Sequence, residues 1–238
     1  MMDRKLKFEL KYFGIILITF LLSSCSTEDA PDCFQIAGKI VQKEVELSPF
    51  EEVIVYDKIK LFIEQGPVQK VVIESGENLM AEVDASLENG RLILKNSNGC
   101  NLLRDYNLTK VYVTVPNLTL LHNAGNRVIE SVGILNFPQI ELISLNQERQ
   151  KDVYTNGDFK LHLNSENVEV TGDDFSNFFL SGSTGYLKLF IAAGDGRVEA
   201  RNLIAETVDV FHRGTNKVIV NPQEMLSGES TNTGESIL

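Results

Sequence analysis

The chain contains no tryptophan, and only three cysteines, three histidines and six prolines among its 238 residues. So few cysteines exclude a disulfide-rich miniprotein, and 17 glycines are too few for a collagen. Basic residues are also scarce, because 22 lysines and arginines stand against 33 aspartates and glutamates, giving a formal net charge of −11. Nucleic acid is therefore not an expected partner, since its binding requires a surplus of positive charge.

The longest apolar run lies near the N-terminus. A basic segment, Met1 to Lys11, precedes the apolar stretch 12–22 and then Ser23, Ser24 and Cys25. Eleven helical residues rise only about 16 Å, so this run is too short to span a membrane and indicates a signal peptide. Leu22 to Cys25 resembles the bacterial lipobox, which implies removal of residues 1–24 and lipidation of Cys25. An ordinary secretory signal with a coincidental cysteine is the alternative.

Removal of the signal segment changes the charge of the chain. Residues 1–24 contain four basic and two acidic residues, so 18 basic and 31 acidic residues remain, a balance of −13. The two other cysteines, Cys33 and Cys100, are expected to form a disulfide in an oxidising compartment, with two buried free thiols as the alternative. We expect residues 25–44 to form the lipidated N-terminus and tether, and residues 45–238 to form a single domain.

From Val45 onward, short apolar runs alternate with Gly, Asn, Asp and Ser, which predicts half-buried strands and little or no helix. The clearest early strands are Val53–Val55, Leu61–Ile63, Val71–Ile73, Leu92–Leu94 and Val111–Val113. The pair Asn89 and Gly90 predicts a tight turn.

The second half of the chain is periodic. Comparable strand starts occur at Leu118, Ile140, Leu161, Leu187 and Val208, and a second set at Val128, Val153, Val168, Val198 and Val218. A recurrence of about 20–22 residues predicts an all-β solenoid in which each coil buries its inward residues on the next coil. A β-sandwich, which also has strands every 8–12 residues, is the competing fold.

Several segments resemble the GIN-domain family of Bacteroidetes lipoproteins. They are Phe50–Val55, Val71–Leu79, Asn89–Leu94, Gly194–Leu203 and Phe211–Asn216. The resemblance implies a right-handed β-helix and the head domain of an adhesin, and a cysteine before the domain together with Cys100 fits it. The Ser-Gly repeats that are common in the family are reduced here to residues 181–185. The resemblance carries no catalytic residue.

Residues suited to catalysis or metal binding are scattered along the chain. His122, His162 and His212 show none of the spacings of a metal site, so no metal is expected. Carbohydrate cleavage on a β-helix requires an acid and a base on one face. The candidates are Asp173, Asp174, Asp195, Arg197, Glu199 and Arg201.

These candidates fit structural roles. Asp173 and Asp174 fit a turn after Gly172, whereas Glu199 and Arg201 fit a surface pair. Ser181 and Ser183 lack a nearby histidine and a Gly-x-Ser-x-Gly motif, and residues 194–196 lack the features of a phosphate loop. The sequence therefore predicts no enzyme, no catalytic residue and no cofactor.

The candidate surface-binding residues are His212, Arg213 and Tyr186. In the distinctive segment 211–214, Phe211 is expected to be buried, with His212 and Arg213 exposed at a turn. Tyr154 and the pair Phe178 and Phe179 are further aromatic residues that could stack on sugars if they are exposed.

Together these features predict a lipid-anchored protein of the outer membrane, on the periplasmic side or at the cell surface. Its expected role is that of a non-enzymatic, adhesin-like binding or scaffold module. The expected partners are the membrane, through the anchor, and a cell-surface protein or glycan; no oligomeric state is indicated. A glycan-binding or carbohydrate-active β-helix lipoprotein is the alternative, and a purely structural periplasmic protein is a third possibility.

Overall fold

The computed structural model describes residues 36–99, 108–146, 151, 153–231 and 233–237. The expected signal segment 1–24 and all three cysteines, Cys25, Cys33 and Cys100, lie outside these residues, so the lipidation site and the disulfide stay predictions. Within the described residues, no helix is long and apolar enough to cross a membrane.

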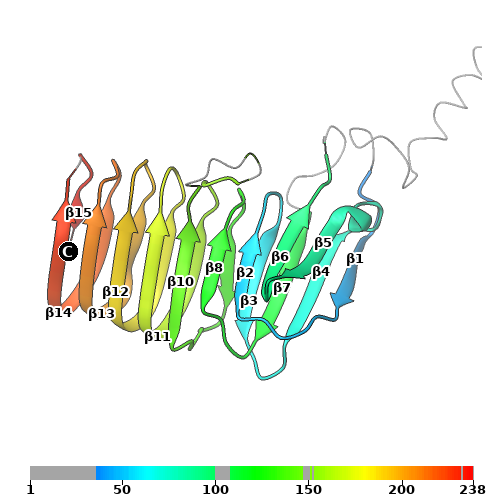
Figure 1. Ribbon diagram of the computed structural model, residues 1–238, viewed down its shortest axis with the longest axis horizontal. Coiled ribbons are helices and arrows are strands. Elements are labelled where there is room, and N and C mark those ends of the chain that lie inside the picture. Colours follow the sequence, from blue (N-terminus) through cyan, green and yellow to red (C-terminus); the bar gives the residue numbers. More distant parts are fainter. Residues whose placement is uncertain (1–35, 100–107, 147–150, 152, 232, 238) are drawn as a thin grey trace, which may run out of the picture.

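A single sheet contains all fifteen strands of the described chain (Figure 1). The described ranges contain one helix, the 3-10 helix η1, so the prediction of an all-β protein with little helix is confirmed. The elements are β1 (Ile40–Val45), β2 (Glu52–Val55), β3 (Lys60–Gln65), β4 (Lys70–Gly76), η1 (Glu77–Glu82), β5 (Val83–Glu88), β6 (Arg91–Asn96), β7 (Lys110–Val115), β8 (Leu120–Asn123), β9 (Ile129–Val132), β10 (Gln139–Ser144), β11 (Phe159–Gly172), β12 (Phe178–Ile191), β13 (Val198–His212), β14 (Val218–Ser230) and β15 (Ser236–Ile237).

The N-terminal part of the sheet is mixed. Strand β4 pairs antiparallel with both β1 and β7, and β5 pairs antiparallel with β6. The five early strands predicted from apolar runs lie within β2, β3, β4, β6 and β7. Asn89 and Gly90 join β5 to β6 with φ values of 54° and 80°, which confirms the predicted turn. Strand β1 crosses the expected boundary between residues 44 and 45, since all of it pairs with β4.

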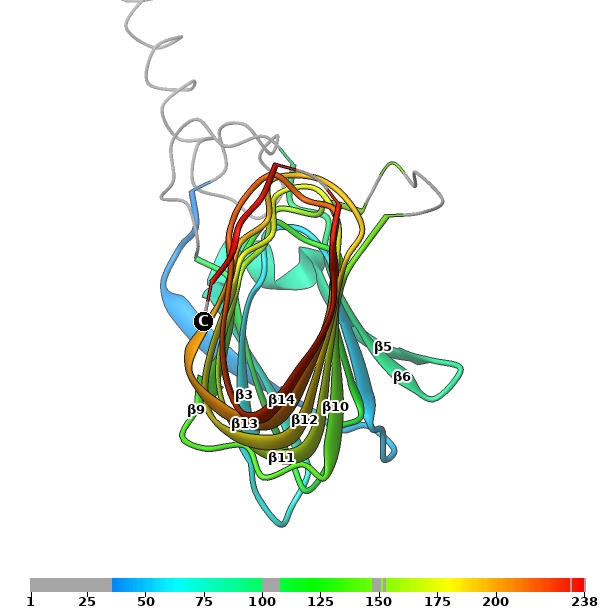
Figure 2. The same ribbon diagram turned by 90° about the vertical axis from the view of Figure 1, so that its left-hand side faces the viewer.

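From β8 onward every pairing in the sheet is parallel. The long strands β11 to β14 lie side by side in nearly continuous register, so equivalent residues recur every 17–21 positions: Phe159, Phe178, Val198 and Val218 are 19, 20 and 20 residues apart. Seen along the stack, the sheet wraps into a nearly closed, barrel-like oval (Figure 2). The described strands thus form one curved sheet rather than the two separate sheets of a sandwich.

The two expected sets of short strands exist in only part of the chain. The first half of β11 pairs with β9 and its second half pairs with β10, so two short strands precede it, one on each side of the oval. In β11 to β13 the two strands are fused into one bent strand of 14 or 15 residues. The expected separate starts at Leu161 and Val168, at Leu187 and at Val208 are therefore wrong, and Val153 lies outside the described strands. Residues 164–165 and 183–184 extend the ladder across the bend, whereas Glu166 and Gly185 lie between paired positions.

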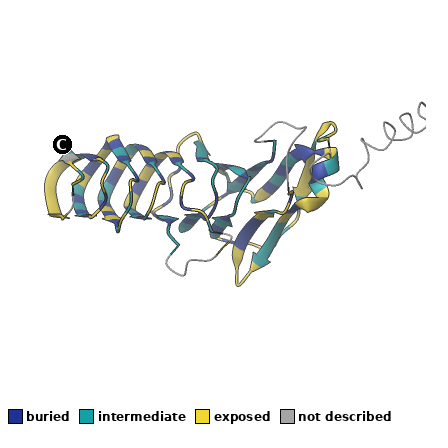
Figure 3. Cartoon of the chain, turned by 90° about the horizontal axis from the view of Figure 1, so that it is seen from above, coloured by how far each residue is buried: buried dark blue, intermediate teal, exposed yellow. Residues whose placement is uncertain are grey.

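Inward-facing residues form apolar columns that run along the stack. Phe159 and Phe178 stack with their ring centroids 4.8 Å apart, and Val198 and Val218 continue this column. All four are buried. Buried and more exposed residues alternate along most of strands β11 to β13 (Figure 3), because successive side chains of a strand point to opposite faces. The interior is thus filled by residues from neighbouring strands in register.

Gly182 illustrates how closely neighbouring strands approach at the bend. Its φ of 110° is rarely adopted by other residues, and a Cβ atom placed there would lie 1.9 Å from the carbonyl oxygen of Leu163. Only glycine fits between these two backbones, so this position belongs to the architecture of the bend.

The apolar column makes a stability prediction for two adjacent phenylalanines. Phe178 is 1% exposed, whereas Phe179 is 37% exposed on the outer face. We expect Phe178→Ala to lower the free energy of unfolding by about 3–5 kcal/mol, because it leaves a cavity against Phe159. Phe179→Ala is the matched control and should change it by less than about 1 kcal/mol. Urea unfolding followed by circular dichroism measures both; equal losses would contradict the assigned strand faces.

Candidate functional site

Outward-facing residues form rows that cross the strands at right angles. Because β11, β12 and β13 pair in parallel and in register, each side chain has a neighbour one strand away. Two of these rows lie at the bend in the middle of the long strands. We call Asn136, Asn164 and Ser183 the amide row, and Glu166, Gly185 and Glu206 the glutamate row.

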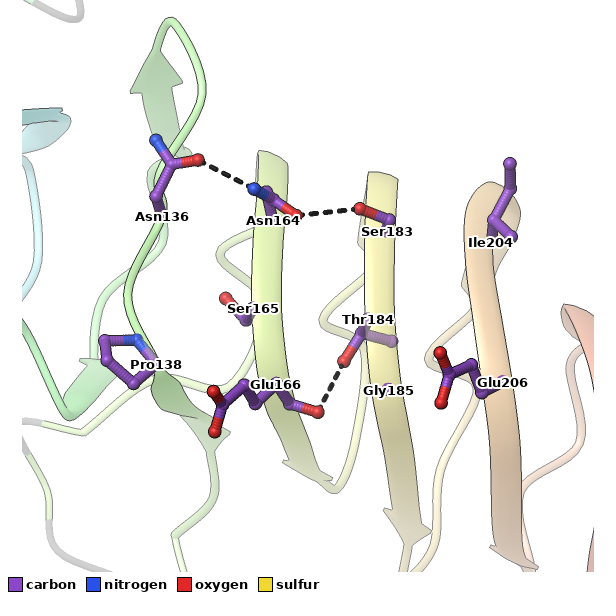
Figure 4. A pocket seen from close by; sticks show the side chains of 10 residues that line it. All are labelled: Asn136, Pro138, Asn164, Ser165, Glu166, Ser183, Thr184, Gly185, Ile204 and Glu206. Carbon is purple, nitrogen blue, oxygen red and sulfur yellow. Dashed lines mark hydrogen bonds between the residues drawn. The ribbon is translucent and has the colours of Figure 1, made fainter.

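The amide row is a continuous chain of hydrogen bonds (Figure 4). The Asn164 side-chain amide donates to Oδ1 of Asn136 at 2.9 Å, and the Ser183 hydroxyl donates to Oδ1 of Asn164 at 2.9 Å. At the far end, the backbone N–H of Asn136 donates to Oε1 of Gln65 at 2.7 Å. These bonds fix the orientation of side chains that are otherwise exposed.

The two rows border a groove of about 700 Å³ on the outer face. Its floor contains Ser165 and Thr184, which are 8% and 5% exposed. The Thr184 hydroxyl lies 3.3 and 3.1 Å from the backbone carbonyl oxygens of Glu166 and Tyr186, to either of which its one hydrogen can be donated. The Ser165 hydroxyl, by contrast, is buried and has no hydrogen-bond partner within the described part of the chain. The groove is lined by Asn136, Pro138, Asn164, Ser165, Glu166, Ser183, Thr184, Gly185, Ile204 and Glu206.

The groove is electrostatically negative. Glu166 and Glu206 are exposed, and in the described part of the chain neither carboxylate takes part in an ion pair or hydrogen bond. None of the lining residues is basic. Gly185 lies between the two glutamates, and a Cβ atom there would meet the Glu166 carbonyl oxygen at 3.0 Å and Glu206 Oε2 at 3.9 Å. The arrangement therefore suits a ligand that carries hydrogen-bond donors and no negative charge.

The three residues expected at a binding surface are not brought together. His212 is fully buried, so its expected exposure is wrong. It continues the inward alternation of Val208 and Val210, whereas Phe211 points outward and stacks on Phe190 at 4.9 Å. Phe211 had been expected to be buried because it is apolar, and this expectation is also wrong.

Arg213 and Tyr186 occupy different parts of the surface. Arg213 is exposed just after β13, where its Nε donates to the carbonyl of Ala192 at 2.7 Å. Tyr186 is half-buried in the middle of β12, in register with Asn167 and Thr207 beside the glutamate row. Of the three, Tyr186 alone adjoins the groove.

A second hollow, of about 450 Å³, collects several residues that the sequence singled out separately. His162, Phe179, Ser181 and Glu199 line it. Phe179 is exposed as a possible stacking residue requires, but Phe178 is buried. Arg197 donates a hydrogen bond to the Glu199 carboxylate and Arg201 lies 3.5 Å from it, which confirms the predicted surface pair with Arg201. The Arg197 hydrogen bond lowers the pKa of Glu199 and keeps this carboxylate ionised.

The remaining acidic candidates support turns. Asp173 and Asp174 follow Gly172 as predicted, and Asp174 Oδ2 accepts a hydrogen bond from Thr155 at 2.7 Å. Burial raises the pKa of Asp173. Asp195 accepts a hydrogen bond from the Thr215 hydroxyl at 2.8 Å in the next turn of the stack.

The histidines lie in different environments. His122 is on β8 and is half-buried, and burial lowers its pKa; His162 is exposed on β11. Among the described residues, no group of three or more His, Cys, Asp or Glu is placed to hold a metal ion.

The sequence reading missed most of the groove. Of its lining residues only Ser183 had been considered, and then as a nucleophile. The sequence does contain one signal for the groove, because outward residues that meet on neighbouring strands are about 20 positions apart. Ser183 follows Asn164 by 19 positions, Gly185 follows Glu166 by 19, and Glu206 follows Gly185 by 21. Recognising this signal requires the register between strands, which short motifs do not contain.

Comparisons with known proteins point to one family. A family model described as "Putative auto-transporter adhesin, head GIN domain" matches residues 49–237. Among solved structures, the chain is similar to a "putative adhesin" from Bacteroides fragilis, with a TM-score of 0.67, 16% identity, and coverage of 84% of this chain and 97% of that one. No curated protein matches.

Two further solved structures share the fold at low identity. A "putative adhesin" from Parabacteroides merdae has a TM-score of 0.51 and 15% identity, covering 84% of this chain and 93% of that one. A "putative lipid binding protein" from Parabacteroides distasonis has a TM-score of 0.52 and 12% identity, covering 84% of this chain and 94% of that one. At such identities the likeness concerns the fold.

Buried His212 makes a prediction about stability and pH. Burial lowers its pKa, and neither ring nitrogen has a hydrogen-bond partner among the described residues. The unfolded chain therefore binds a proton below about pH 6.5 that the folded chain does not, so this residue costs stability as the pH falls, by at most about 1.4 kcal/mol per pH unit.

We expect His212→Leu to reduce the drop in melting temperature between pH 7.5 and pH 5.5. Differential scanning calorimetry measures the drop in the wild type, in this variant and in His162→Leu, which alters an exposed histidine and serves as the control. An unchanged drop in His212→Leu would show that His212 does not contribute.

Proposed function

The chain belongs to the head GIN domain family of adhesin-like proteins, and on that premise we propose that it is a non-enzymatic binding module of the bacterial cell envelope. The observation that carries this proposal is the groove at the bend of the long strands. Its polar side chains are fixed by the amide row but remain accessible on the outer face. Groups that are ordered before binding lose little entropy when a partner docks.

We also propose that the strand stack is a right-handed β-helix with coils of about 20 residues. The parallel, in-register pairing of β11 to β14 supports this arrangement, and parallel crossover connections are almost always right-handed. Such a stack is stiff along its length, because each strand is hydrogen-bonded to both neighbours. A stiff stack would hold the groove at a defined distance from its attachment point.

Attachment to the outer membrane through lipidated Cys25 is the expected way in which this module is displayed. Two or more acyl chains give stable membrane binding, since each buried CH₂ contributes about 0.8 kcal/mol. With a disulfide between Cys33 and Cys100, little free chain would separate the lipid from the domain. The protein would then lie close to its membrane, either on the periplasmic side or at the cell surface.

A carbohydrate-active enzyme is the second candidate function, and the glutamate row is the observation that favours it. Glu166 and Glu206 lie two strands apart on the outer face, and glycosidases use two carboxyl groups that flank the scissile bond. Figure 4, however, shows only the Glu206 carboxylate leaning toward Gly185, whereas the Glu166 carboxylate points away from it. The two carboxylates therefore do not face one another across a bound sugar ring, and binding without turnover fits the groove better.

Anchoring and display can be tested with Cys25→Ser in a Bacteroidetes host. We expect the wild-type protein to incorporate labelled palmitate and to sediment with outer membranes, whereas Cys25→Ser does neither. Cys33→Ser serves as the control for a general effect of cysteine loss. Labelling of Cys25→Ser at the wild-type level would reject the lipobox assignment.

The adhesin-like role predicts a change in cell attachment. Cells that carry the wild-type protein should attach to a coated surface more strongly than cells that lack it, and protease added to intact cells should remove both the protein and the extra attachment. Survival of the protein on protease-treated intact cells, together with unchanged attachment, would favour a structural periplasmic protein.

A further inference from the structure

We propose that the groove between the amide row and the glutamate row binds a neutral glycan chain. This inference rests on the proposed binding function and specifies its ligand class. It is carried by three observations on the described residues: a preformed set of amides and hydroxyls, a buried hydroxyl without a partner, and two separate carboxylates that form no ion pair and have no basic residue among the groove lining.

The amide row offers both donors and acceptors to a ligand. Each sugar hydroxyl can donate one hydrogen bond and accept others, so a glycan is matched by side chains that do both. Asn136, Asn164 and Ser183 already fix one another at 2.9 Å, and as exposed residues they keep unused donor and acceptor capacity. A ligand can therefore bind them without first ordering these side chains.

Ser165 provides independent evidence for a ligand. The Ser165 residue is more than nine-tenths buried and lines the groove, and its Oγ has no hydrogen-bond partner among the described residues. Figure 4 shows the hydroxyl on the side of β11 that faces the segment of Asn136 and Pro138. A buried polar group without a partner costs about 1–3 kcal/mol. The Oγ atom itself is solvent-inaccessible, so a ligand hydroxyl on the floor of the groove would supply the missing partner after the Ser165 side chain rotates toward it.

The glutamate row offers two separate acceptors. Gly185 has no side chain, and Figure 4 shows the Glu206 carboxylate leaning toward it, whereas the Glu166 carboxylate points away, toward Pro138. A sugar ring over Gly185 can donate a hydroxyl to Glu206, and a neighbouring ring of the same chain can donate one to Glu166. Ile204 is 52% exposed at the end of the amide row and offers an apolar contact for the C–H face of a ring.

Charge determines which glycans fit. Two free carboxylates and the absence of any basic lining residue oppose uronic acids and sulfated sugars. A small cation is also disfavoured, because the two carboxylates belong to strands that are not adjacent, the Glu166 carboxylate points away from Gly185, and no third acidic residue lines the groove. A cationic peptide would pair with the carboxylates, but its backbone offers one donor and one acceptor per residue, whereas a sugar ring offers several hydroxyls that each donate and accept. A neutral, hydroxyl-rich chain therefore matches the closely spaced amides and hydroxyls of the groove more completely.

The test uses the purified mature chain on an array of neutral and anionic linear oligosaccharides of two to eight sugars. Neutral oligosaccharides that bind are then titrated by isothermal calorimetry, with a Lys-rich peptide as the competing probe. We expect binding to neutral chains and none to anionic ones. Release of reducing ends, followed in the same samples, detects turnover.

Three variants locate the site. Ser165→Ala should weaken glycan binding about tenfold while leaving the melting temperature unchanged or raised, since it removes an unpartnered buried hydroxyl. Glu206→Gln should weaken it by a similar factor. Glu224→Gln is the matched control on β14, where Glu224 is exposed outside the groove, and it should bind as the wild type does.

Three results would overturn the proposal. The first is that the folded protein binds no neutral oligosaccharide on the array. The second is that it binds the Lys-rich peptide more tightly than any neutral oligosaccharide. The third is that Ser165→Ala and Glu206→Gln bind the glycan as tightly as the control Glu224→Gln does. The proposed function fails separately, when intact cells neither display the protein nor attach through it. Cells that attach equally well with the Ser165→Ala and Glu206→Gln proteins would refute the glycan site but retain the adhesin-like role.

Discussion

Parallel pairing of strands in register is the constraint on which the rest of the structure depends. The long strands β12 and β13 are hydrogen-bonded to a long strand on each side, so a residue has the same position in the stack as its equivalent 17–21 residues away. This one relation aligns inward residues into apolar columns and outward residues into polar rows. The same strand register therefore determines both which residues meet in the core and which residues meet in the candidate site.

The turns follow the same rule. Asp158 Oδ1 accepts hydrogen bonds from the backbone N–H of Asn177 at 3.1 Å and from its side-chain amide at 2.9 Å, and Asn177 Oδ1 accepts one from the backbone N–H of Arg197 at 3.1 Å. The side chain of each turn thus caps the backbone of the next one. At the other end of the molecule the pairing changes to antiparallel in β1, β4 and β7, with η1 beside them (Figure 1). This change of direction interrupts the parallel stack.

Local pattern was sufficient to predict the elements but not their partners. Alternating apolar residues identified the early strands, and Asn89 with Gly90 identified a turn, because both signals depend on nearest neighbours in sequence. The fusion of two strands into β11 was missed because Asn164 and Ser165 keep their pairing with β12 through the bend despite their polar side chains. His212 was misplaced for a related reason: strand parity from Val208 and Val210 outweighs the apolar character of Phe211.

The groove could not be predicted because its residues have no common local motif. Asn164, Ser183 and Ile204 form neighbouring positions of one row but differ in chemistry, and so do Glu166, Gly185 and Glu206. A surface that served only to space or stiffen the protein would tolerate similar residues in every strand. Here the hydrogen-bonded amides, the gap at Gly185 and the unpartnered hydroxyl of Ser165 coincide on β11 to β13 alone among the described strands. Such a local break in an otherwise repetitive surface favours one defined contact site over uniform adhesion along the stack.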